Sequence, residues 1–277
     1  MAVITFKYRI KDRSARRRLE RHAGACNYVW NYCCEAQRHA MKWDGRWPSA
    51  FDLIKLCTGS SKELGLHSDT ISVICREFAV RRDTIRRCPR WRSAKKSLGW
   101  VPIVRRAVQI DGATVTYLKR GYRFWLSREI GGEIKAGAFV QDARDRWYVC
   151  LQCEVADDLP TGNGQIGIDL GLKTLATCSD GTAVPALNHY RRYEGVLAKA
   201  QRAKNRPRMR AIHAKIANSR RHHLHEHSTR IARENRLIVV GNVSAAKLAK
   251  TRMAKSVFDA GWSTFRNQLR YKASRHG

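Results

Sequence analysis

The sequence is poor in acidic residues and has no long apolar run. Only 23 Asp and Glu oppose 54 Lys and Arg, which leaves a formal net charge of +31 on 277 residues. No stretch approaches the roughly 18 consecutive apolar residues typical of a membrane-spanning helix. The first ten residues alternate like a half-buried strand and do not resemble a secretory signal. These absences predict a cytoplasmic protein with no membrane partner.

The cysteines form no disulfide framework. There are nine, an odd number, and they are scattered along the first two-thirds of the chain. Only Cys150 and Cys153 have zinc-knuckle spacing, and both lie in an alternating segment typical of a strand. Residues three apart on a strand point to opposite faces, so these two thiols cannot share an ion. We therefore interpret the cysteines as buried, reduced thiols.

The excess of positive charge predicts a polyanionic partner. Hydrophobic residues make up 43% of the chain, more than a disordered basic tail carries, so we expect a folded core. Repulsion among many cations destabilises a compact state unless an anion neutralises part of it, and nucleic-acid phosphates are the leading expectation. The length is compatible with two domains.

The spacing of apolar residues changes along the first half of the chain. Residues from about 13 to 95 show mostly helical spacing, with breaks at Trp47-Pro48 and near Gly59. From about Val101, short alternating segments are separated by Asp-Gly and Arg-Gly turns. Together with the first strand, these segments predict a small antiparallel β-barrel with a helical insertion over residues 1–160.

A second module follows a linker at residues 157–164 and opens with the segment QIGIDLGLKTLATCSDGTAV. Asp169 is centred in an apolar strand between two glycines, and Asp180-Gly181 then turns the chain into a hairpin. A carboxylate in such a strand is costly unless a cation or hydrogen-bond donors compensate it. Asp169 is therefore a candidate metal ligand. The alternative is that it caps a turn or pairs with Lys173.

Residues 189–236 carry 14 Lys and Arg against 3 Glu, and their pattern predicts two amphipathic helices broken near Asn205-Arg206-Pro207. A solvated helix face usually mixes both signs, so this excess favours a nucleic-acid groove. The candidate contacts are Lys173, Arg191, Arg192, Lys199, Arg202, Lys204, Arg206, Lys215, Arg220 and Arg221. Six histidines in this stretch lack acidic or Cys partners at metal-binding spacing, and we interpret them as further polar or partly cationic contacts.

A short buried strand, Leu237–Val240, follows these helices and ends at Gly241. The order of strand, hairpin, helix pair and returning strand is that of an RNase H-like core, in which metal-binding carboxylates cluster at strand ends. An acidic residue is therefore expected at position 241, but the residue there is glycine.

The segment GIDLGLKTLATCSDG resembles the first RuvC motif of the TnpB (OrfB) family of insertion-sequence proteins, relatives of type V CRISPR effectors. Further segments resemble this family in the same order, so that the resemblance covers essentially the whole chain. They include TFKYRI, ACNYVWNYCCEAQ, YRFWLSR, FVQDARDRWYV, LAKAQRAKNRPRMRAIHAKIANSRRHHLHEHST and GNVSAAKLAK.

The resemblance implies an α+β multidomain fold. The first strand and residues 96–160 would form a wedge β-barrel, with a helical recognition insert at about 13–95. Residues 161–277 would form a partial RNase H-like (RuvC) α/β domain. Family members bind a noncoding RNA from the transposon end and use it to find DNA, which they cut with two Mg²⁺ ions.

The same resemblance implies that the nuclease centre is incomplete. Asp169 matches the first catalytic aspartate and Mg²⁺ ligand, while Gly241 falls where most relatives have the second-motif glutamate. Asp180 and Asp259 are the nearest other acids, but neither is a persuasive substitute. The chain stops at Gly277, before the zinc ribbon and the third-motif aspartate of the family. A single carboxylate does not hold Mg²⁺ firmly, so we expect Mg²⁺ binding to be weak or absent.

Two functions therefore remain open. The chain is either an RNA-guided DNA endonuclease whose other ligands are supplied elsewhere, or a nuclease-dead protein that binds RNA or DNA and cuts nothing. We favour the second. A DNA-binding regulator unrelated to transposons is a distant third, because no helix-turn-helix or zinc-finger spacing supports it.

Aromatic residues in the predicted helical insert have two interpretations. Their side chains could stack on bases, but at helical spacing most of them are expected in the core. They are Tyr28, Trp30, Tyr32, Trp43 and Trp47.

Overall fold

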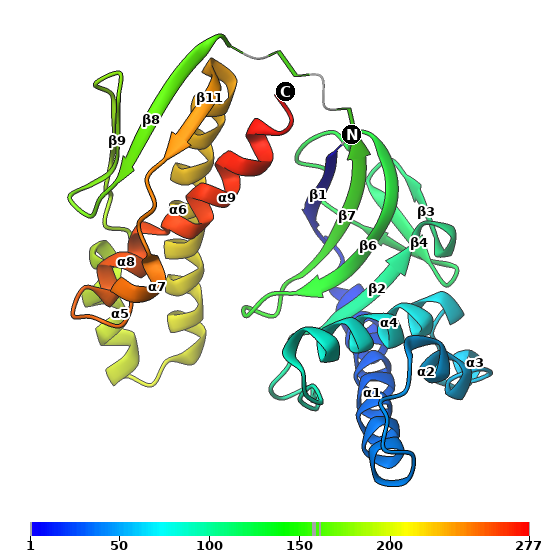
Figure 1. Cartoon of the computed structure of the whole chain (residues 1–277). Coiled ribbons are helices and arrows are strands. Elements are labelled where there is room, and N and C mark those ends of the chain that lie inside the picture. The colour runs from blue at the N-terminus through cyan, green and yellow to red at the C-terminus, as the bar shows by residue number, and fades with distance from the viewer. Residues whose placement is uncertain (1, 157–158, 161, 277) are drawn as a thin grey trace. The chain divides into compact units, whose positions relative to one another are not determined.

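The computed structural model describes residues 2–156, 159–160 and 162–276 (Figure 1). The chain is a mixture of helices and mainly antiparallel sheets, and it divides into two compact units, Val3–Val155 and Ala156–Gly277. Of the linker expected at residues 157–164, residues 157, 158 and 161 lie outside the described part. No described helix combines the length and apolar character needed to span a membrane.

The first unit places its helices within residues 13–95, where helical spacing predicts them. In chain order its elements are β1 (Ala2–Arg9), α1 (Arg13–Trp43), α2 (Ala50–Leu56), α3 (Ser61–Leu64), α4 (Ser68–Ile85), β2 (Trp100–Val104), β3 (Val108–Asp111), β4 (Thr114–Tyr117), β5 (Arg120–Arg123), β6 (Glu133–Gln141) and β7 (Trp147–Val155).

The strands of this unit form two open sheets, ordered β1-β7-β6-β2 and β3-β4-β5. Outside the named strands, a bridge between Ile10 and Phe124 links the end of β1 to the end of β5. Closing a barrel requires a continuous ring of paired strands, and none of the described sheets makes one. The expected barrel is therefore not confirmed.

The turns of the three-stranded sheet confirm one expectation and correct another. The chain turns at Asp111-Gly112 between β3 and β4, as expected. The expected Arg-Gly turn is wrong, because Arg120 and Gly121 lie inside β5 and pair with β4. The turn between β4 and β5 is made instead by Leu118 and Lys119, which both adopt positive φ. Residues with a Cβ rarely adopt this conformation, so no local signal predicts it.

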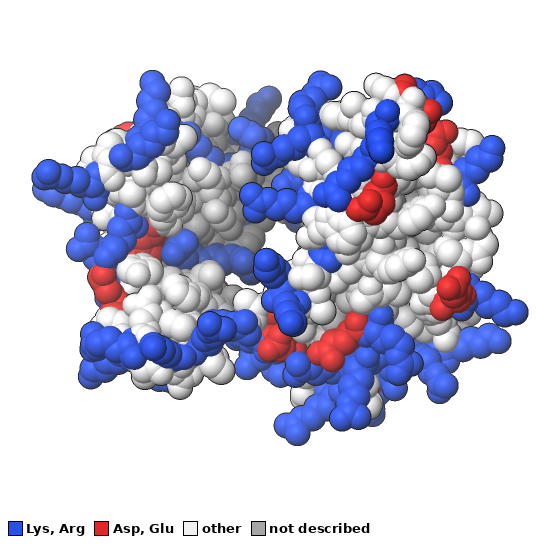
Figure 2. Space-filling model, turned by 90° about the horizontal axis from the view of Figure 1, so that it is seen from below, with Lys and Arg blue, Asp and Glu red and all other residues white. Residues whose placement is uncertain are grey.

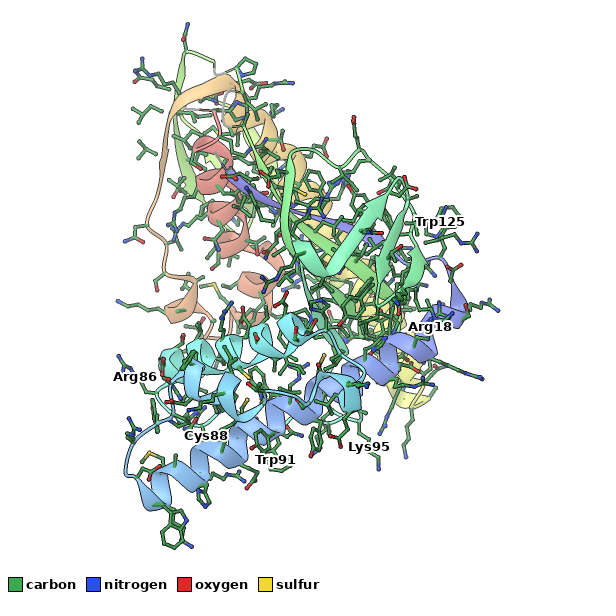
Figure 3. The ribbon with its side chains drawn as sticks, turned by 90° about the vertical axis from the view of Figure 1, so that its right-hand side faces the viewer. Arg18, Arg86, Cys88, Trp91, Lys95 and Trp125 are labelled. Carbon is green, nitrogen blue, oxygen red and sulfur yellow. The ribbon has the colours of Figure 1, made fainter. Side chains whose placement is uncertain are left out.

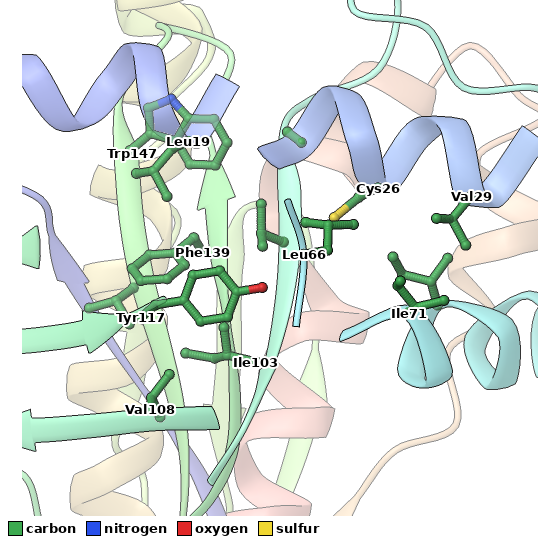
Figure 4. Packing of buried hydrophobic residues seen from close by; sticks show 14 of the residues in the cluster. Leu19, Cys26, Val29, Leu66, Ile71, Ile103, Val108, Tyr117, Phe139 and Trp147 are labelled. Carbon is green, nitrogen blue, oxygen red and sulfur yellow. The ribbon is translucent and has the colours of Figure 1, made fainter. Parts of the chain in front are cut away.

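The core of the first unit lies between α1 and the sheets. Leu19 from α1 and Phe139 from β6 are fully buried, and the Phe139 ring contacts the rings of Tyr117 and Tyr122 (Figure 4). Further along α1, Trp30 packs edge-on against Phe78 of α4, with 5.3 Å between ring centroids. All nine cysteines are free, and most are buried here, as expected.

Polar contacts tie the segment after α4 to α1. The Asn31 side chain donates to the Arg92 carbonyl (2.9 Å) and accepts from the Arg92 amide (2.8 Å). Trp30 Nε1 donates to the Arg90 carbonyl, and Arg92 Nε donates to the Asn27 side chain. An irregular segment needs partners for its backbone groups, and α1 supplies them.

The second unit is built around the sheet β10-β9-β8-β11 (Figure 1). Its elements are β8 (Gly164–Leu170), β9 (Thr174–Cys178), β10 (Ala183–Pro185), α5 (Arg191–Arg202), α6 (Arg206–Glu234), β11 (Asn235–Val240), α7 (Ala245–Leu248), α8 (Ala254–Ala260) and α9 (Trp262–Ala273). Gly181, at φ +83°, turns β9 into β10, as expected for Asp180-Gly181.

One face of this sheet is covered by helices. Ile166, Ile168 and Leu170 are buried, together with Leu224 of α6 and Phe265 of α9. At the edge of the sheet, β11 pairs with β8 and has no second partner strand among the described residues. Its Leu237 and Val239 side chains are more than half exposed, so the opposite face carries apolar groups that no described element covers.

A buried lysine joins α9 to α6. Lys272 Nζ donates to Ser228 Oγ (2.7 Å), Thr229 Oγ1 (2.7 Å) and the His225 carbonyl (2.9 Å). These acceptors are neutral, and burial lowers the pKa of Lys272 to about 8.

Phe265 offers a test of this packing. We expect Phe265→Ala to lower the free energy of unfolding by about 3–5 kcal/mol, because the side chain is fully buried and its removal leaves a cavity. Phe258→Ala is the matched control, since Phe258 is 66% exposed, and should change stability by no more than about 0.5 kcal/mol. Urea denaturation measures both, and equal destabilisation by the two substitutions would contradict the assignment of the core.

Candidate functional site

Asp169 lies on the uncovered face of β8. The side chains along the strand alternate, with Ile168 and Leu170 buried and Asp169 exposed, as the sequence predicts. Asp169 pairs with Thr177 of β9, and Gly167, two residues earlier on the same face, has no side chain to cover the carboxylate. The carboxylate is therefore open to solvent and to a ligand.

Gly241 lies directly beside this carboxylate. β11 runs parallel to β8, with Val240 opposite Ile168, and the Gly241 amide donates to the Ile168 carbonyl (2.8 Å). A Cβ atom at position 241 would be 3.4 Å from Asp169 Oδ1, an ordinary contact distance, and the φ angle of Gly241 is not in the left-handed region. Position 241 is thus the place from which a second carboxylate would meet Asp169.

The two nearest other acids have partners elsewhere. The Asp259 carboxylate on α8 is buried, accepts from the Tyr190 amide (2.9 Å) and pairs with Arg220 (3.3 Å). Asp180 accepts from the amide and hydroxyl of Thr182, and these hydrogen bonds lower the pKa of Asp180. Both acids therefore stabilise local structure.

The described residues do not fit a two-metal centre. No group of three or more His, Cys, Asp or Glu among them is arranged to hold a metal ion. Arg266 of α9 donates to the Gly241 carbonyl, so the side chain that contacts this residue is a cation rather than a metal ligand. The role of Asp169 as a Mg²⁺ ligand stays a prediction, and no catalytic step follows from the geometry.

Helices α5 and α6 form a cationic hairpin. Asn205 caps α6 by accepting from the Arg208 amide (3.0 Å), and Pro207 lies in the first turn, so the expected break is confirmed. Leu197 of α5 packs against Ile212 and Ile216 of α6 in a small apolar core. With these faces turned inward, the basic side chains face solvent, and Lys and Arg far outnumber Asp and Glu on the face of the molecule in Figure 2.

The structure exposes nine of the ten predicted nucleic-acid contacts and buries part of the tenth. The exposed residues are Lys173, Arg191, Arg192, Lys199, Arg202, Lys204, Arg206, Lys215 and Arg221. Arg220 is half-buried and pairs with Asp259, so it has a structural partner. The hairpin also exposes Arg208, which was not predicted as a contact although it lies in the same single-sign run.

Two of the six histidines in residues 189–236, His189 just before α5 and His223 on α6, correct an expectation. His189 and His223 are 4% and 7% exposed, so they are not surface contacts. His189 Nδ1 is 3.0 Å from Ser219 Oγ, and His223 Nε2 is 2.9 Å from the Pro185 carbonyl. Burial lowers the pKa of His189, and the neighbouring cations Arg220 and Arg192 add to this while Asp259 opposes it. The neutral imidazole is therefore favoured.

The aromatic residues of the first unit are more exposed than helical spacing predicts. Trp30 is in the core, but Tyr28 and Trp43 are 63% and 67% exposed. Trp91 and Trp125 are also more than half exposed, and neither was selected from the sequence (Figure 3). Arg38 lies over the Trp91 ring and Lys11 over the Trp125 ring. Basic and aromatic groups thus share this surface.

Comparison with known proteins identifies relatives along the whole chain. Residues 148–252 match the family model OrfB_IS605, described as "Probable transposase". A "Putative RNA-guided DNA endonuclease" of Streptomyces pristinaespiralis is 29% identical over 306 residues, covering 98% of this chain and 75% of that protein. The protein named "Putative RNA-guided DNA endonuclease InsQ" of Escherichia coli K12 is 24% identical, covering 92% and 73%.

A solved structure shares the fold. A chain in the cryo-EM structure of the Cas12f1–sgRNA–target DNA complex superposes with a TM-score of 0.57 at 10% identity. The similarity covers 96% of this chain and 72% of that one.

The buried histidine predicts a pH dependence of stability. Because the folded-state pKa of His189 lies below its ordinary value near 6.5, the unfolded chain takes up the proton first as the pH falls. The free energy of unfolding should therefore decrease below about pH 6.5, and His189→Gln should make this decrease shallower by up to about 1.4 kcal/mol per pH unit.

Chemical denaturation at several pH values measures this effect. His213→Gln is the matched control, since His213 is exposed on α6. If the free energy of unfolding decreases as steeply with falling pH in the His189→Gln variant as in the His213→Gln variant, the burial of His189 is contradicted.

Proposed function

The chain belongs to the TnpB (OrfB) family of insertion-sequence proteins, and we propose that it binds DNA and a transposon-derived RNA without a complete nuclease centre. The observation that carries this proposal is the position of Gly241 beside the Asp169 carboxylate. The returning strand brings position 241 within contact distance of the Asp169 carboxylate, but glycine supplies no ligand there.

The binding part of the proposal rests on charge and on the named relatives. The hairpin of α5 and α6 carries a nearly single-sign surface, and polyanion binding would relieve its self-repulsion. Both relatives described above are named as RNA-guided DNA endonucleases. We extend to this chain the RNA and DNA partners that those names state.

We further propose which part of the family architecture each unit represents. The unit Val3–Val155 would be the wedge module with a helical recognition insert, since α1 to α4 separate β1 from the strands with which it shares a sheet. The unit Ala156–Gly277 would be the RuvC-like module. Its sheet order β10-β9-β8-β11, with β11 parallel to β8 after a helix pair, is the order expected of an RNase H-like core.

The metal part of the proposal follows from the donor set. Mg²⁺ in such a centre activates water and stabilises the leaving oxygen, which requires several carboxylates to position two ions. Asp169 alone does not meet this requirement. We therefore expect a guide-loaded chain to bind target DNA and leave it uncut in Mg²⁺.

The cationic hairpin can be tested by neutralising four exposed residues: Lys199→Gln, Arg202→Gln, Lys204→Gln and Arg206→Gln. We expect affinity for single-stranded RNA or duplex DNA to fall at least about tenfold. The slope of log K against log salt should decrease by about 0.7–0.9 for each phosphate that the variant no longer neutralises. Fluorescence anisotropy over a series of KCl concentrations measures both.

The control removes the same charge from cations that pair with neighbouring acids. It combines Arg16→Gln, Arg38→Gln, Arg106→Gln and Lys135→Gln, all in the first unit. An equal decrease of affinity in the two variants would mean that net charge, rather than the hairpin, governs binding.

Gly241→Glu tests the incomplete metal site. A glutamate at this position reaches Asp169 from a Cβ that fits without a clash, so two carboxylates would face one ion. We expect Mn²⁺, used in place of Mg²⁺ for its electron paramagnetic resonance signal, to bind at least about tenfold more tightly than in the unchanged chain. Gly241→Gln, which adds similar bulk without charge, should produce no such gain.

Cleavage assays separate the two functions that the sequence left open. The proposal expects binding of target DNA by the guide-loaded chain with no product above background. Cleavage by the unchanged chain that Asp169→Ala abolishes would overturn the proposal and establish an active nuclease. If the chain binds no nucleic acid, the binding part of the proposal is overturned.

A further inference from the structure

A cavity of about 360 Å³ in the first unit is lined by four basic residues and one leucine. Its walls are Arg18, Arg21 and His22 of α1, together with Leu118 and Arg120 from the β4–β5 hairpin. The cavity lies far from Asp169 in sequence and within the other unit. None of these residues was selected from the sequence.

None of the three guanidinium groups forms an ion pair with an acid in the described part of the chain. Glu20 of α1 pairs with Arg16 (2.7 Å), and Asp12, just before α1, pairs with Arg123 (2.8 Å) and feels only a weaker attraction from Arg18. Three like charges around one cavity repel one another, so the empty arrangement is unfavourable and an anion would stabilise it.

Arg18 adds a second, independent observation. Its guanidinium lies over the Tyr122 ring, 5.4 Å from the centroid, which holds the side chain in place (Figure 3 labels Arg18). Its Nε is buried and has no partner at hydrogen-bond geometry among the described residues, although Arg18 lies close enough to the Tyr122 hydroxyl to act on its pKa. A buried donor without a partner is costly, and an anion oxygen in the cavity would satisfy it.

The backbone of the β4–β5 hairpin is strained beside the cavity. Leu118 and Lys119 both have positive φ, at 50° and 59°, in a two-residue turn that normally takes Asn and Gly. Each such residue costs about 1–2 kcal/mol. This turn pairs Arg120 with Tyr117, and Arg120 lines the cavity. The strained turn is therefore the one that brings a basic side chain to the cavity.

We propose that this arginine cavity binds a phosphate group of the nucleic acid that the protein carries. Guanidinium groups recognise phosphate oxygens with paired N–H donors, and three of them match the charge and the several oxygens of one phosphate. The inference rests on the proposed function, because the phosphate belongs to the bound RNA or DNA. It assigns to the first unit a fixed anchor for the backbone, separate from the cationic hairpin of the second.

The test uses the full chain with Arg21→Gln and Arg120→Gln combined. Both side chains are exposed, and Arg18 is left in place because it packs against Tyr122. The matched control combines Arg13→Gln and Arg17→Gln, which removes the same charge from exposed positions of α1 outside the cavity. The probes are a single-stranded RNA and a DNA duplex of similar length, each measured across a KCl series.

We expect the affinity of the cavity variant to fall at least about tenfold for one or both probes. The slope of log K against log KCl concentration should become shallower by about 0.7–0.9, as expected for one lost phosphate contact. The affinity of the control variant should fall less than about threefold. A decrease confined to RNA or to DNA identifies the source of the phosphate. Equal behaviour of the two variants toward both probes would overturn the proposal, whereas failure of the unchanged chain to bind either probe would instead refute the proposed function.

A thermal readout separates anion binding from a structural role. Inorganic pyrophosphate should raise the melting temperature of the unchanged chain and of the control variant, and raise it clearly less in the cavity variant. Without added anion, the cavity variant should be at least as stable as the unchanged chain, since two mutually repelling charges are removed. A large decrease in stability would show that these arginines support the fold, and would contradict an anion site.

Discussion

The parallel pairing of β11 with β8 is the interaction on which the second unit depends. Parallel neighbours cannot be joined by a tight turn, so the chain must cross the sheet between them. Here the crossing segment contains α5 and α6, which become the cationic hairpin. The same pairing sets Gly241 beside Asp169. One set of backbone hydrogen bonds therefore determines both where the cationic hairpin leaves the sheet and which residue lies beside the Asp169 carboxylate.

The excess of Lys and Arg lies on the helix faces that the apolar cores leave exposed. Each core buries aliphatic and aromatic side chains from one face of its helices, and the remaining faces carry the excess of Lys and Arg. Where a cation is buried, it has specific partners: Lys272 donates to neutral oxygens, and Arg82 donates to the Pro48 carbonyl. The Nε atoms of Arg18, Arg220 and Arg275 lack such a partner among the described residues, and of these three arginines Arg18 lines the arginine cavity.

Local features of this fold were predictable from sequence, and features that depend on distant pairing were not. The alternation around Asp169, the Asp180-Gly181 turn and the helix break at Asn205 all depend on a few adjacent residues. The open sheets depend on how strands meet across the chain, which periodicity does not report. The burial of His189 likewise results from packing that its polar sequence neighbours conceal.

The candidate sites show the same division. Position 241 was identified from the order of elements, and the structure places it beside Asp169 as that order implies. The arginine cavity combines α1 with a hairpin about one hundred residues later, through a Leu-Lys turn that no turn preference favours. No single segment contains enough of it to be recognised.

The free edge of β11 has a consequence for the behaviour of the protein in solution. An edge strand with exposed Leu237 and Val239 is a template for pairing with another copy. At low ionic strength the strong net charge keeps copies apart, but salt near 1 M shortens the screening length to about 3 Å. Colloidal stability should therefore decline as salt is raised, so a high-salt wash that strips nucleic acid from this basic protein would also promote its self-association.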